Sequence, residues 1–257
     1  MTSRSTDEHP GERLTDGGRE EGWTAGTDHL GDGTHPPLAV DVDGTLTGPD
    51  RAVDPRVLAV LRGWRAPVVI ATGKALPYPV GLCEFVGIPR TVIAENGGVA
   101  FVHETDDLLV IGDRTAAQAV ADEYRAAGHD LGWGAADLVN RWRETEIAAS
   151  RDAPLEPLEE IAAEHGLEVV DTGFAYHVKS PDVSKGGALE RVAPTLDRMA
   201  GEFVAVGDSQ NDVSTFEAAG RSYAVGNADA AAREAADVVL DAGYADGFLD
   251  AVARITE

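Results

Sequence analysis

Short apolar segments that end directly in polar side chains constrain the fold of this chain more than any other feature. Residues 67–71 are apolar at every position, so a strand formed there presents no face to water. Strands of this kind are typical of parallel sheets that helices cover on both faces. Residues 38–40, 91–94 and 202–206 form similar runs, with Thr91 and Glu202 as polar first residues of the last two. The sequence therefore predicts an α/β fold built on a Rossmann-like parallel sheet with helices on both faces.

Helical periodicity alternates with these runs, as such a fold requires. The segment 54–64 has apolar residues at helical spacing, with Asp54 as its N-cap and Pro55 at its first helical position. A helix over 185–199 is expected to bend or divide at Pro194. The other predicted elements of this part are a hairpin of strands 99–102 and 108–111, helices 213–219, 228–236 and 245–255, and strands 223–225 and 238–240.

The middle of the chain has a different pattern, with helices beside short strands that alternate less regularly. Helices are predicted at 115–127 and 154–165, and strands at 143–150, 167–170 and 174–178. This pattern favours a small α+β cap inserted into the larger sheet. The predicted divisions are a disordered acidic and polar extension at 1–36, the core at 37–113 and 178–257, and the cap at 114–177.

The charge balance excludes several classes of partner. Asp and Glu number 45 against 21 Lys and Arg, which gives a net charge of -24. Such a surface repels nucleic acid and anionic membranes. An acidic surface for a partner protein and adaptation to high salt both remain open, and the even spread of acidic residues favours the second. We expect the fold to be less stable at low ionic strength.

Cysteine usage and hydropathy indicate the compartment. The chain has one cysteine, Cys83, so no intrachain disulfide can form, and we expect this side chain to be a buried apolar residue. No apolar run approaches the roughly 20 residues that cross a bilayer, and the N-terminal residues do not resemble a secretory signal. The expectation is a soluble, cytoplasmic protein.

The first strand end carries two carboxylates two residues apart, Asp41 and Asp43, followed by Gly44 and Thr45. Two carboxylates on one turn suit two tasks in phosphate chemistry. One can attack phosphorus and become an aspartyl phosphate, while the other donates a proton to the leaving oxygen and later accepts one from water. An Asx turn whose carboxylates only bind backbone amides also fits this pattern.

A second acidic pair, Asp208 and Asp212, follows the predicted strand 202–206 and opens the next helix. Carboxylates at this spacing can add oxygen ligands for Mg²⁺, which binds one or two carboxylates together with waters and substrate phosphate. An ordinary N-cap with an acidic first turn is the alternative interpretation. Carboxyl ends of parallel strands meet at one edge of a sheet, so this pair should lie near Asp41.

The cations and small residues near these carboxylates complete the pattern. Lys185 stands at a predicted helix start, where a lysine opposes the helix dipole, and this conflict suggests function. Its ammonium could offset charge on a phosphoryl oxygen. A solvated surface lysine, the usual interpretation of a single lysine, is the alternative. Thr72 offers a hydroxyl, and Gly73 permits close backbone approach to a phosphate. Converging carboxylates would repel one another strongly without Mg²⁺ and Lys185.

In this order, the motifs DVDGT, ATGK, a lysine and GDSQND resemble the haloacid-dehalogenase-like phosphatase superfamily over residues 38–257. The resemblance implies that Asp41 is the nucleophile, that Asp43 is the general acid and base, and that Mg²⁺ is the cofactor. It assigns metal binding to Asp41, to Asp43 through its backbone carbonyl, and to Asp208 and Asp212. The residues expected to bind substrate phosphate are Thr72, Gly73, Lys185 and Asn211.

A cap between the second and third motifs resembles the archaeal phosphoglycolate phosphatase branch, with ENGG and DVSKG as further points of likeness. This implies a small phosphorylated metabolite as substrate, with 2-phosphoglycolate favoured. Lys74 departs from that branch, which usually has Asn or Arg there. Cap residues such as Arg141, Arg143 or His177 are expected to recognise the leaving group.

Other functions remain open at this stage. Within enzymes, a sugar-phosphate phosphatase of the sucrose-phosphate or mannosylphosphoglycerate type is the main alternative, and a phosphomutase shares the first half-reaction. A receiver-type phosphoacceptor also places Asp residues around Mg²⁺ at strand ends, but the inserted cap and the second carboxylate of the Asp41 turn argue against it. Both a monomer and a homodimer fit the sequence.

Overall fold

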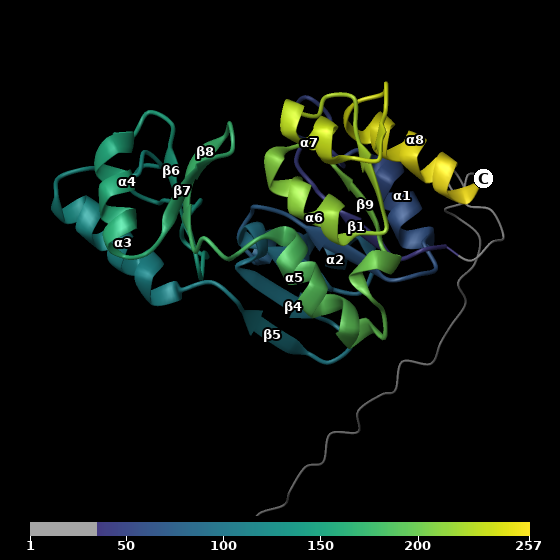
Figure 1. Ribbon diagram of the computed structural model, residues 1–257, viewed down its shortest axis with the longest axis horizontal. Helices are drawn as coiled ribbons and strands as arrows, with labels where there is room; N and C mark the ends of the chain where they lie inside the picture. The colour runs from purple at the N-terminus through teal and green to yellow at the C-terminus, as the bar shows by residue number, and fades with distance from the viewer. Residues whose placement is uncertain (1–34) are drawn as a thin grey trace, which may run out of the picture.

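A computed structural model describes residues 35–257, so the predicted extension lies outside the described residues except for its last two positions. Its main feature is an eight-stranded sheet in the order β11-β10-β9-β1-β2-β3-β4-β5 (Figure 1). The strands from β11 to β3 run parallel, β4 pairs antiparallel with β3, and β5 pairs antiparallel with β4. The strands are β1 (Leu38–Val40), β2 (Val68–Ala71), β3 (Val92–Ala94), β4 (Val99–Val102), β5 (Asp107–Val110), β9 (Val204–Gly207), β10 (Arg221–Ala224) and β11 (Val238–Val239).

Helices cover both faces of this sheet, as the uniformly apolar strands predicted. Alternate strand residues point to opposite faces, so Val40 packs with α1, α2 and α8, while Ala39 packs with α5. The helices are α1 (Pro55–Gly63), α2 (Pro77–Val86), α5 (Lys185–Val192), α6 (Val213–Ala218), α7 (Ala230–Ala235) and α8 (Tyr244–Thr256).

Local sequence signals explain most of these helices. Asp54 caps α1 by accepting a hydrogen bond from the backbone N–H of Arg56, with proline at the first helical position. Pro194 ends α5, since the chain continues as the 3₁₀ helix η2 (Ala193–Leu196). Cys83 lies buried in α2 as a free cysteine, as expected. Helix α2 itself escaped prediction, because two prolines and a glycine interrupt its helical pattern.

The cap is a second layered body at the left of Figure 1. A three-stranded antiparallel sheet in the order β6-β8-β7 packs against two helices. The predicted strand 143–150 is shorter in the structure, and strand β8 crosses the division predicted after residue 177, so the domain boundaries stay predictions. The elements are α3 (Arg114–Ala126), β6 (Ile147–Ser150), α4 (Leu155–Glu164), β7 (Glu168–Asp171) and β8 (Ala175–Lys179).

The topology brings the polar strand ends together. Strands β9, β1 and β2 are neighbours and parallel, so their carboxyl ends lie side by side at one edge of the sheet. Asp208, Asp41 and Thr72 follow these strands directly. None of the helices within residues 35–257 is long and apolar enough to cross a membrane.

Helices α5 and α6 approach each other so closely at Gly186 that a side chain has no room. A Cβ atom there would lie 1.9 Å from the carbonyl oxygen of Ser214. We expect Gly186→Ala to lower the free energy of unfolding by about 1–3 kcal/mol, because the two helices must separate. Denaturant titration in high-salt buffer measures this change.

Gly201→Ala is the matched control for this prediction, since a Cβ atom at Gly201 meets nothing within 4 Å. The control should change the free energy of unfolding by less than about 0.5 kcal/mol. Equal stability of the two variants would contradict the tight contact between α5 and α6.

Candidate active site

The turn after β1 places Asp41 and Asp43 in different environments. Asp41 is buried, and its backbone N–H donates to the carbonyl oxygen of Val206 in the neighbouring strand. The Asp43 side chain is 36% exposed and faces a cavity. Gly44 has φ +88°, and a Cβ atom there would lie 2.2 Å from Oδ2 of Asp208. The glycine therefore lets this turn pass directly against the second acidic pair.

Lys185 is fully buried and lies at the centre of the site. It is the first residue of α5, which Ser184 caps by accepting from the backbone N–H of Gly187. The Lys185 Nζ donates to Oδ1 of Asp41 at 2.7 Å and to Oδ1 of Asp212 at 2.7 Å. It also donates to Oδ1 of Asn211 at 3.1 Å.

The charges around Lys185 decide its protonation. Burial alone would lower the pKa of Lys185, but the carboxylates of Asp212 and Asp41 outweigh burial and raise it, so the ammonium form is maintained. Burial raises the pKa of Asp41 well above its ordinary value, with Asp212 and Asp208 adding to the rise and Lys185 opposing it. The ammonium contacts the buried carboxylates of Asp41 and Asp212, and the half-buried carboxylate of Asp208 lies close to them, so the cluster has more carboxylates than cations.

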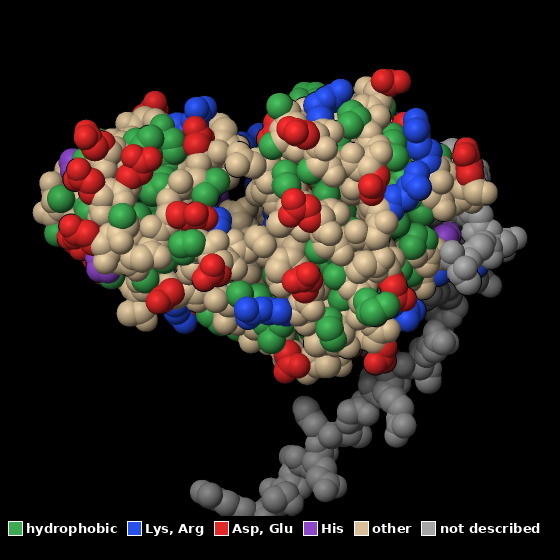
Figure 2. Space-filling model, viewed as in Figure 1, with side chains coloured by type: hydrophobic (Ala, Val, Ile, Leu, Met, Phe, Trp, Pro, Cys, Tyr) green, Lys and Arg blue, Asp and Glu red, His purple; other side chains and the backbone are tan. Residues whose placement is uncertain are grey.

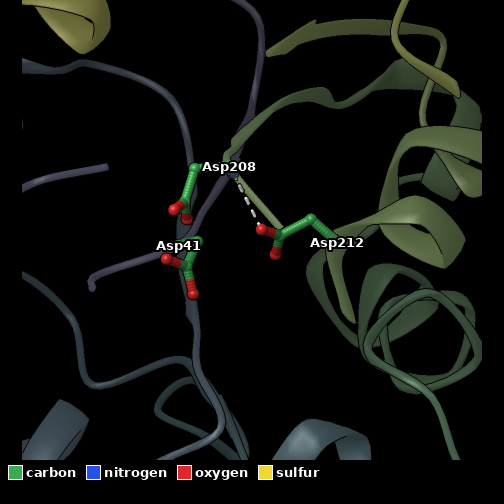
Figure 3. Close-up of side chains that lie close together, drawn as sticks. All are labelled: Asp41, Asp208 and Asp212. Atoms are coloured by element: carbon green, nitrogen blue, oxygen red, sulfur yellow. Dashed lines mark hydrogen bonds between the residues drawn. The ribbon is translucent and has the colours of Figure 1, made fainter. Parts of the chain in front are cut away.

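Asp208 and Asp212 hold the loop after β9 in place. Oδ2 of Asp212 accepts from the backbone N–H groups of Asp208 at 3.0 Å and Ser209 at 3.1 Å. Figure 3 shows the Asp212 carboxylate turned toward the backbone of Asp208, while the carboxylates of Asp41 and Asp208 lie side by side. Burial raises the pKa of Asp208 to about 7, and the charge of Asp212 contributes to this rise.

This cluster fits a hard divalent cation. One carboxylate oxygen from each of Asp41, Asp208 and Asp212 lies within 4.8 Å of the others. Carboxylate oxygens are ligands that Mg²⁺ prefers, and the raised pKa of Asp208 reflects a negative charge that a cation would offset. Within the described residues the Asp43 carboxylate is outside this group.

The residues after β2 form the wall next to Asp43. Lys74 Nζ lies 3.0 Å from Oδ1 of Asp43, and an arginine of the opposite loop, Arg51, lies 3.6 Å from the same oxygen. The Thr72 hydroxyl accepts from the backbone N–H of Lys74 at 3.2 Å. Gly73 lines the same cavity as Asp41 and Asp43. The structure thus brings the residues predicted for catalysis, phosphate binding and metal binding together at one edge of the sheet, and their roles stay predictions.

Asn96 is a site residue that the sequence analysis did not assign. It lies in the 3₁₀ turn η1 (Glu95–Gly97) with φ +53°, and its side chain is buried. Its Oδ1 accepts from Nδ2 of Asn211 at 3.0 Å, and its Nδ2 donates to Oε2 of Glu146 at 2.9 Å. Asn96 therefore joins the Lys185 cluster to the cap. The ENGG motif marked this turn but indicated no contact.

The cap contributes an ion cluster around Glu146, which is also buried. Burial would raise the pKa of Glu146, but Arg143 and His177 outweigh it and hold the pKa below its ordinary value. Arg143 additionally donates to the carbonyl oxygen of Gly73 at 3.0 Å. Of the three cap residues proposed to recognise a leaving group, Arg143 and His177 line the cavity of Asp41, whereas Arg141 lines a different one.

A cleft opens between cap and core, and Figure 2 shows the hollow between the two bodies. Asp41, Asp43 and Lys74 line a cavity of about 410 Å³ in it. A second cavity of about 660 Å³ adjoins it, since Asp208 and Asn211 line both. The carboxylates at the strand ends therefore face a space that holds a small molecule, with the cap as its roof.

This chain belongs to the haloacid dehalogenase-like hydrolases, whose family pattern matches residues 38–125 and 156–252. A crystal structure of Thermoplasma acidophilum 0175 shares the fold, with a TM-score of 0.73 and 23% identity, covering 87% of this chain and 99% of that one. A haloacid dehalogenase-like hydrolase from Bacteroides thetaiotaomicron has a TM-score of 0.68 with 19% identity, covering 86% of this chain and 99% of that one.

Close relatives in sequence carry one name. A phosphoglycolate phosphatase of Halobacterium salinarum is 63% identical over 224 residues, covering 87% of this chain and 99% of the relative. One from Haloarcula marismortui is 61% identical, covering 86% of this chain and 98% of the relative. Another from Methanococcoides burtonii is 36% identical, covering 84% and 94%. The first two come from halophilic organisms, which fits the excess of acidic residues.

The Asp208 carboxyl predicts how pH and Mg²⁺ act together on stability. Its pKa of about 7 in the folded state exceeds the ordinary value of 3.8, so the folded protein binds a proton that the unfolded chain releases. Without Mg²⁺ this contribution is fully present below about pH 4 and is lost as the pH rises through 7. Since Mg²⁺ competes with that proton, Mg²⁺ should raise the melting temperature more at pH 8 than at pH 5.5.

Thermal melts at constant KCl, with and without Mg²⁺, measure this difference. In Asp208→Asn the effect of Mg²⁺ should be small at both pH values, while the control Asp152→Asn, at an exposed carboxylate of the cap, should behave like the wild type. Equal stabilisation by Mg²⁺ at both pH values would show that the Asp208 carboxyl does not take part.

Proposed function

We propose that this chain is a Mg²⁺-dependent phosphatase that hydrolyses 2-phosphoglycolate to glycolate and phosphate. The observation that carries the proposal is the fully buried Lys185, which holds the Asp41 carboxylate at 2.7 Å at the edge of a cavity. Family membership supports hydrolysis, and the relatives from Halobacterium and Haloarcula, at 63% and 61% identity, support this substrate.

The first half-reaction forms a bond between an Asp41 carboxylate oxygen and phosphorus and breaks the ester bond. Asp41 must be ionised to attack, and Lys185 favours its ionised form against burial. The leaving oxygen of glycolate takes a proton from Asp43, whose side chain faces the cavity and is free of the Lys185 cluster. The products are glycolate and a phosphorylated Asp41.

The second half-reaction returns the enzyme to its starting state. Asp43, now ionised, takes a proton from a water molecule, whose oxygen bonds to phosphorus as the acyl phosphate bond breaks. Phosphate leaves, and Asp41 regains its carboxylate. The exposure of Asp43 to the cavity lets the same side chain meet the leaving group first and water afterwards.

The groups that we propose to hold the phosphoryl oxygens come from the ends of β2 and β9 and from the first residue of α5. We assign this task to Lys185, to the Thr72 hydroxyl with the Gly73 backbone, and to Asn211, which is fixed between Lys185 and Asn96. Asp41, Asp208 and Asp212, with the backbone carbonyl of Asp43, would hold the Mg²⁺. When bound, Mg²⁺ offsets negative charge on the phosphoryl oxygens and on the carboxylates themselves.

Single substitutions distinguish the roles of Asp41 and Asp43. Asp41→Asn keeps the shape of the side chain but removes the nucleophile, so phosphate release from 2-phosphoglycolate should fall by roughly 10⁴-fold or more. A phosphate assay with Mg²⁺ in high-salt buffer measures this, with sugar phosphates tested beside 2-phosphoglycolate. Asp152→Asn should keep full activity. An active Asp41→Asn variant would exclude the mechanism, and a preference for a sugar phosphate would correct the substrate.

Asp43→Asn should act differently, because Asp43 serves both half-reactions. With 2-phosphoglycolate, kcat should fall by roughly 10²- to 10⁴-fold. With p-nitrophenyl phosphate, whose leaving group needs little protonation, the first half-reaction should continue while hydrolysis of the aspartyl phosphate slows. Stopped-flow measurement should then show a burst of p-nitrophenol close to one equivalent of enzyme. Slow turnover without a burst would remove Asp43 from the second half-reaction.

A further inference from the structure

The two cavities of the cleft differ in charge. Acidic side chains line the larger one, and its lysine, Lys179, lies 2.7 Å from Oε1 of Glu168. Basic side chains gather on the smaller one, beside Asp41 and Asp43. An anionic group attached to the leaving oxygen is therefore repelled by one side of the cleft and attracted by the other. The basic residues that line the smaller cavity are Arg51, Lys74, Arg143 and His177.

Two of these four groups already have buried partners. Arg143 is ion-paired with Glu146 and donates to the carbonyl oxygens of Val139 and Gly73. His177 Nδ1 lies 3.1 Å from Oε1 of Glu146. Either could turn toward a ligand only by giving up its contact with the buried carboxylate of Glu146, which is costly. The cap residues that the sequence favoured for the leaving group are therefore committed to holding the cap.

Lys74 and Arg51 are placed differently. Both lie against the single carboxylate of Asp43, at 3.0 Å and 3.6 Å. Their side chains are 33% and 55% exposed, so both can contact a ligand in the cavity. The backbone N–H of Lys74 is bonded to the Thr72 hydroxyl, which fixes the start of this side chain beside the proposed phosphate site. Two cations facing one carboxylate leave a net positive charge at this point.

The position of Asp43 indicates what this charge meets. In the proposed mechanism Asp43 protonates the ester oxygen, so the leaving group lies next to it. In 2-phosphoglycolate a single methylene separates the ester oxygen from the carboxylate. A carboxylate so near the ester oxygen lies within reach of a cation that contacts Asp43, and a charged hydrogen bond to it would be stronger than one to a neutral group.

We propose that Lys74, assisted by Arg51, is the specificity-determining residue that binds the carboxylate of the leaving group. The site selects phosphate monoesters with an anionic group adjacent to the ester carbon and disfavours neutral ones. This inference rests on the proposed function, because the position of the ester oxygen next to Asp43 is taken from the proposed mechanism. It moves recognition of the leaving group from the cap to the residue that follows the Thr72–Gly73 turn of the core.

Binding without turnover tests the subsite directly. On the Asp41→Asn background, calorimetry with Mg²⁺ compares 2-phosphoglycolate with 2-hydroxyethyl phosphate, which replaces the carboxylate by a neutral hydroxymethyl group. We expect tighter binding of 2-phosphoglycolate. Adding Lys74→Met should weaken the binding of 2-phosphoglycolate roughly tenfold, while the affinity for the neutral ester should change by less than about twofold. Lys74→Arg should restore most of the preference, and Arg62→Met, at an exposed arginine on α1, should leave it unchanged.

The outcomes separate this inference from the proposed function. An equal loss of affinity for both esters in Lys74→Met would overturn the proposed subsite, because it would mean that Lys74 acts only through Asp43. No preference between the esters before mutation would also overturn it. Failure of the enzyme with intact Asp41 to hydrolyse 2-phosphoglycolate would contradict the proposed function, while the calorimetric comparison would still decide on Lys74. Lys74→Gln replaces the Met variant if the latter melts below the assay temperature.

Discussion

A lysine ammonium buried among three carboxylates is the interaction on which the rest of this structure depends. Lys185 contacts Asp41 from the first strand end and Asp212 from the loop after β9, so one side chain of α5 sets the distance between two motifs far apart in sequence. Removing one partner of such a buried group leaves an uncompensated charge, which costs several kcal/mol. The ammonium also suits the place because it is a compact charge whose three donors meet separate acceptors, whereas a guanidinium prefers a planar pair. The cluster that remains is short of positive charge, and in the proposed function a divalent cation would offset this excess of carboxylates.

The same cluster reaches the cap through the turn after β3. Asn96 lies between Asn211, which touches Lys185, and Glu146 of the cap. Glu95 beside it accepts from the backbone N–H groups of three consecutive cap residues, 144 to 146. Both residues of this turn have positive φ, a conformation that costs energy and persists only where surrounding contacts impose it. The contacts that position the Asp41 carboxylate therefore continue through Lys185, Asn211 and Asn96 to Glu146, which links the position of the cap to that of Asp41.

The sequence allowed the strand ends to be predicted because their signal is local. Uniformly apolar runs that stop at Asp41, Thr72 and Asp208 imply a covered parallel sheet, and the topology then brings those ends together. Helix α2 could not be predicted in this way, since packing against the sheet outweighs its prolines. Glu146 was hidden for a related reason, because a charged residue before an apolar run is ordinary until its partners, distant in the chain, are known. The roles of individual site residues and the domain boundaries rest on the proposed function and stay predictions.

The chain has three lysines: Lys74 and Lys179 line the cleft, and the buried Lys185 contacts Asp41, which also lines it. This placement explains how so acidic a protein can bind an anion. In concentrated salt the Debye length is about 3 Å, so acidic groups elsewhere on the surface do not reach a ligand in the cavity. Contacts at hydrogen-bond distance are screened least, and these are supplied by Lys185 beside Asp41 and by Lys74 beside Asp43. Lys179 lies on the opposite side, paired with Glu168. In the proposed function the sign of the ligand is therefore decided by two ammonium groups within bonding distance of Asp41 and Asp43, while the net charge of the surface serves solubility.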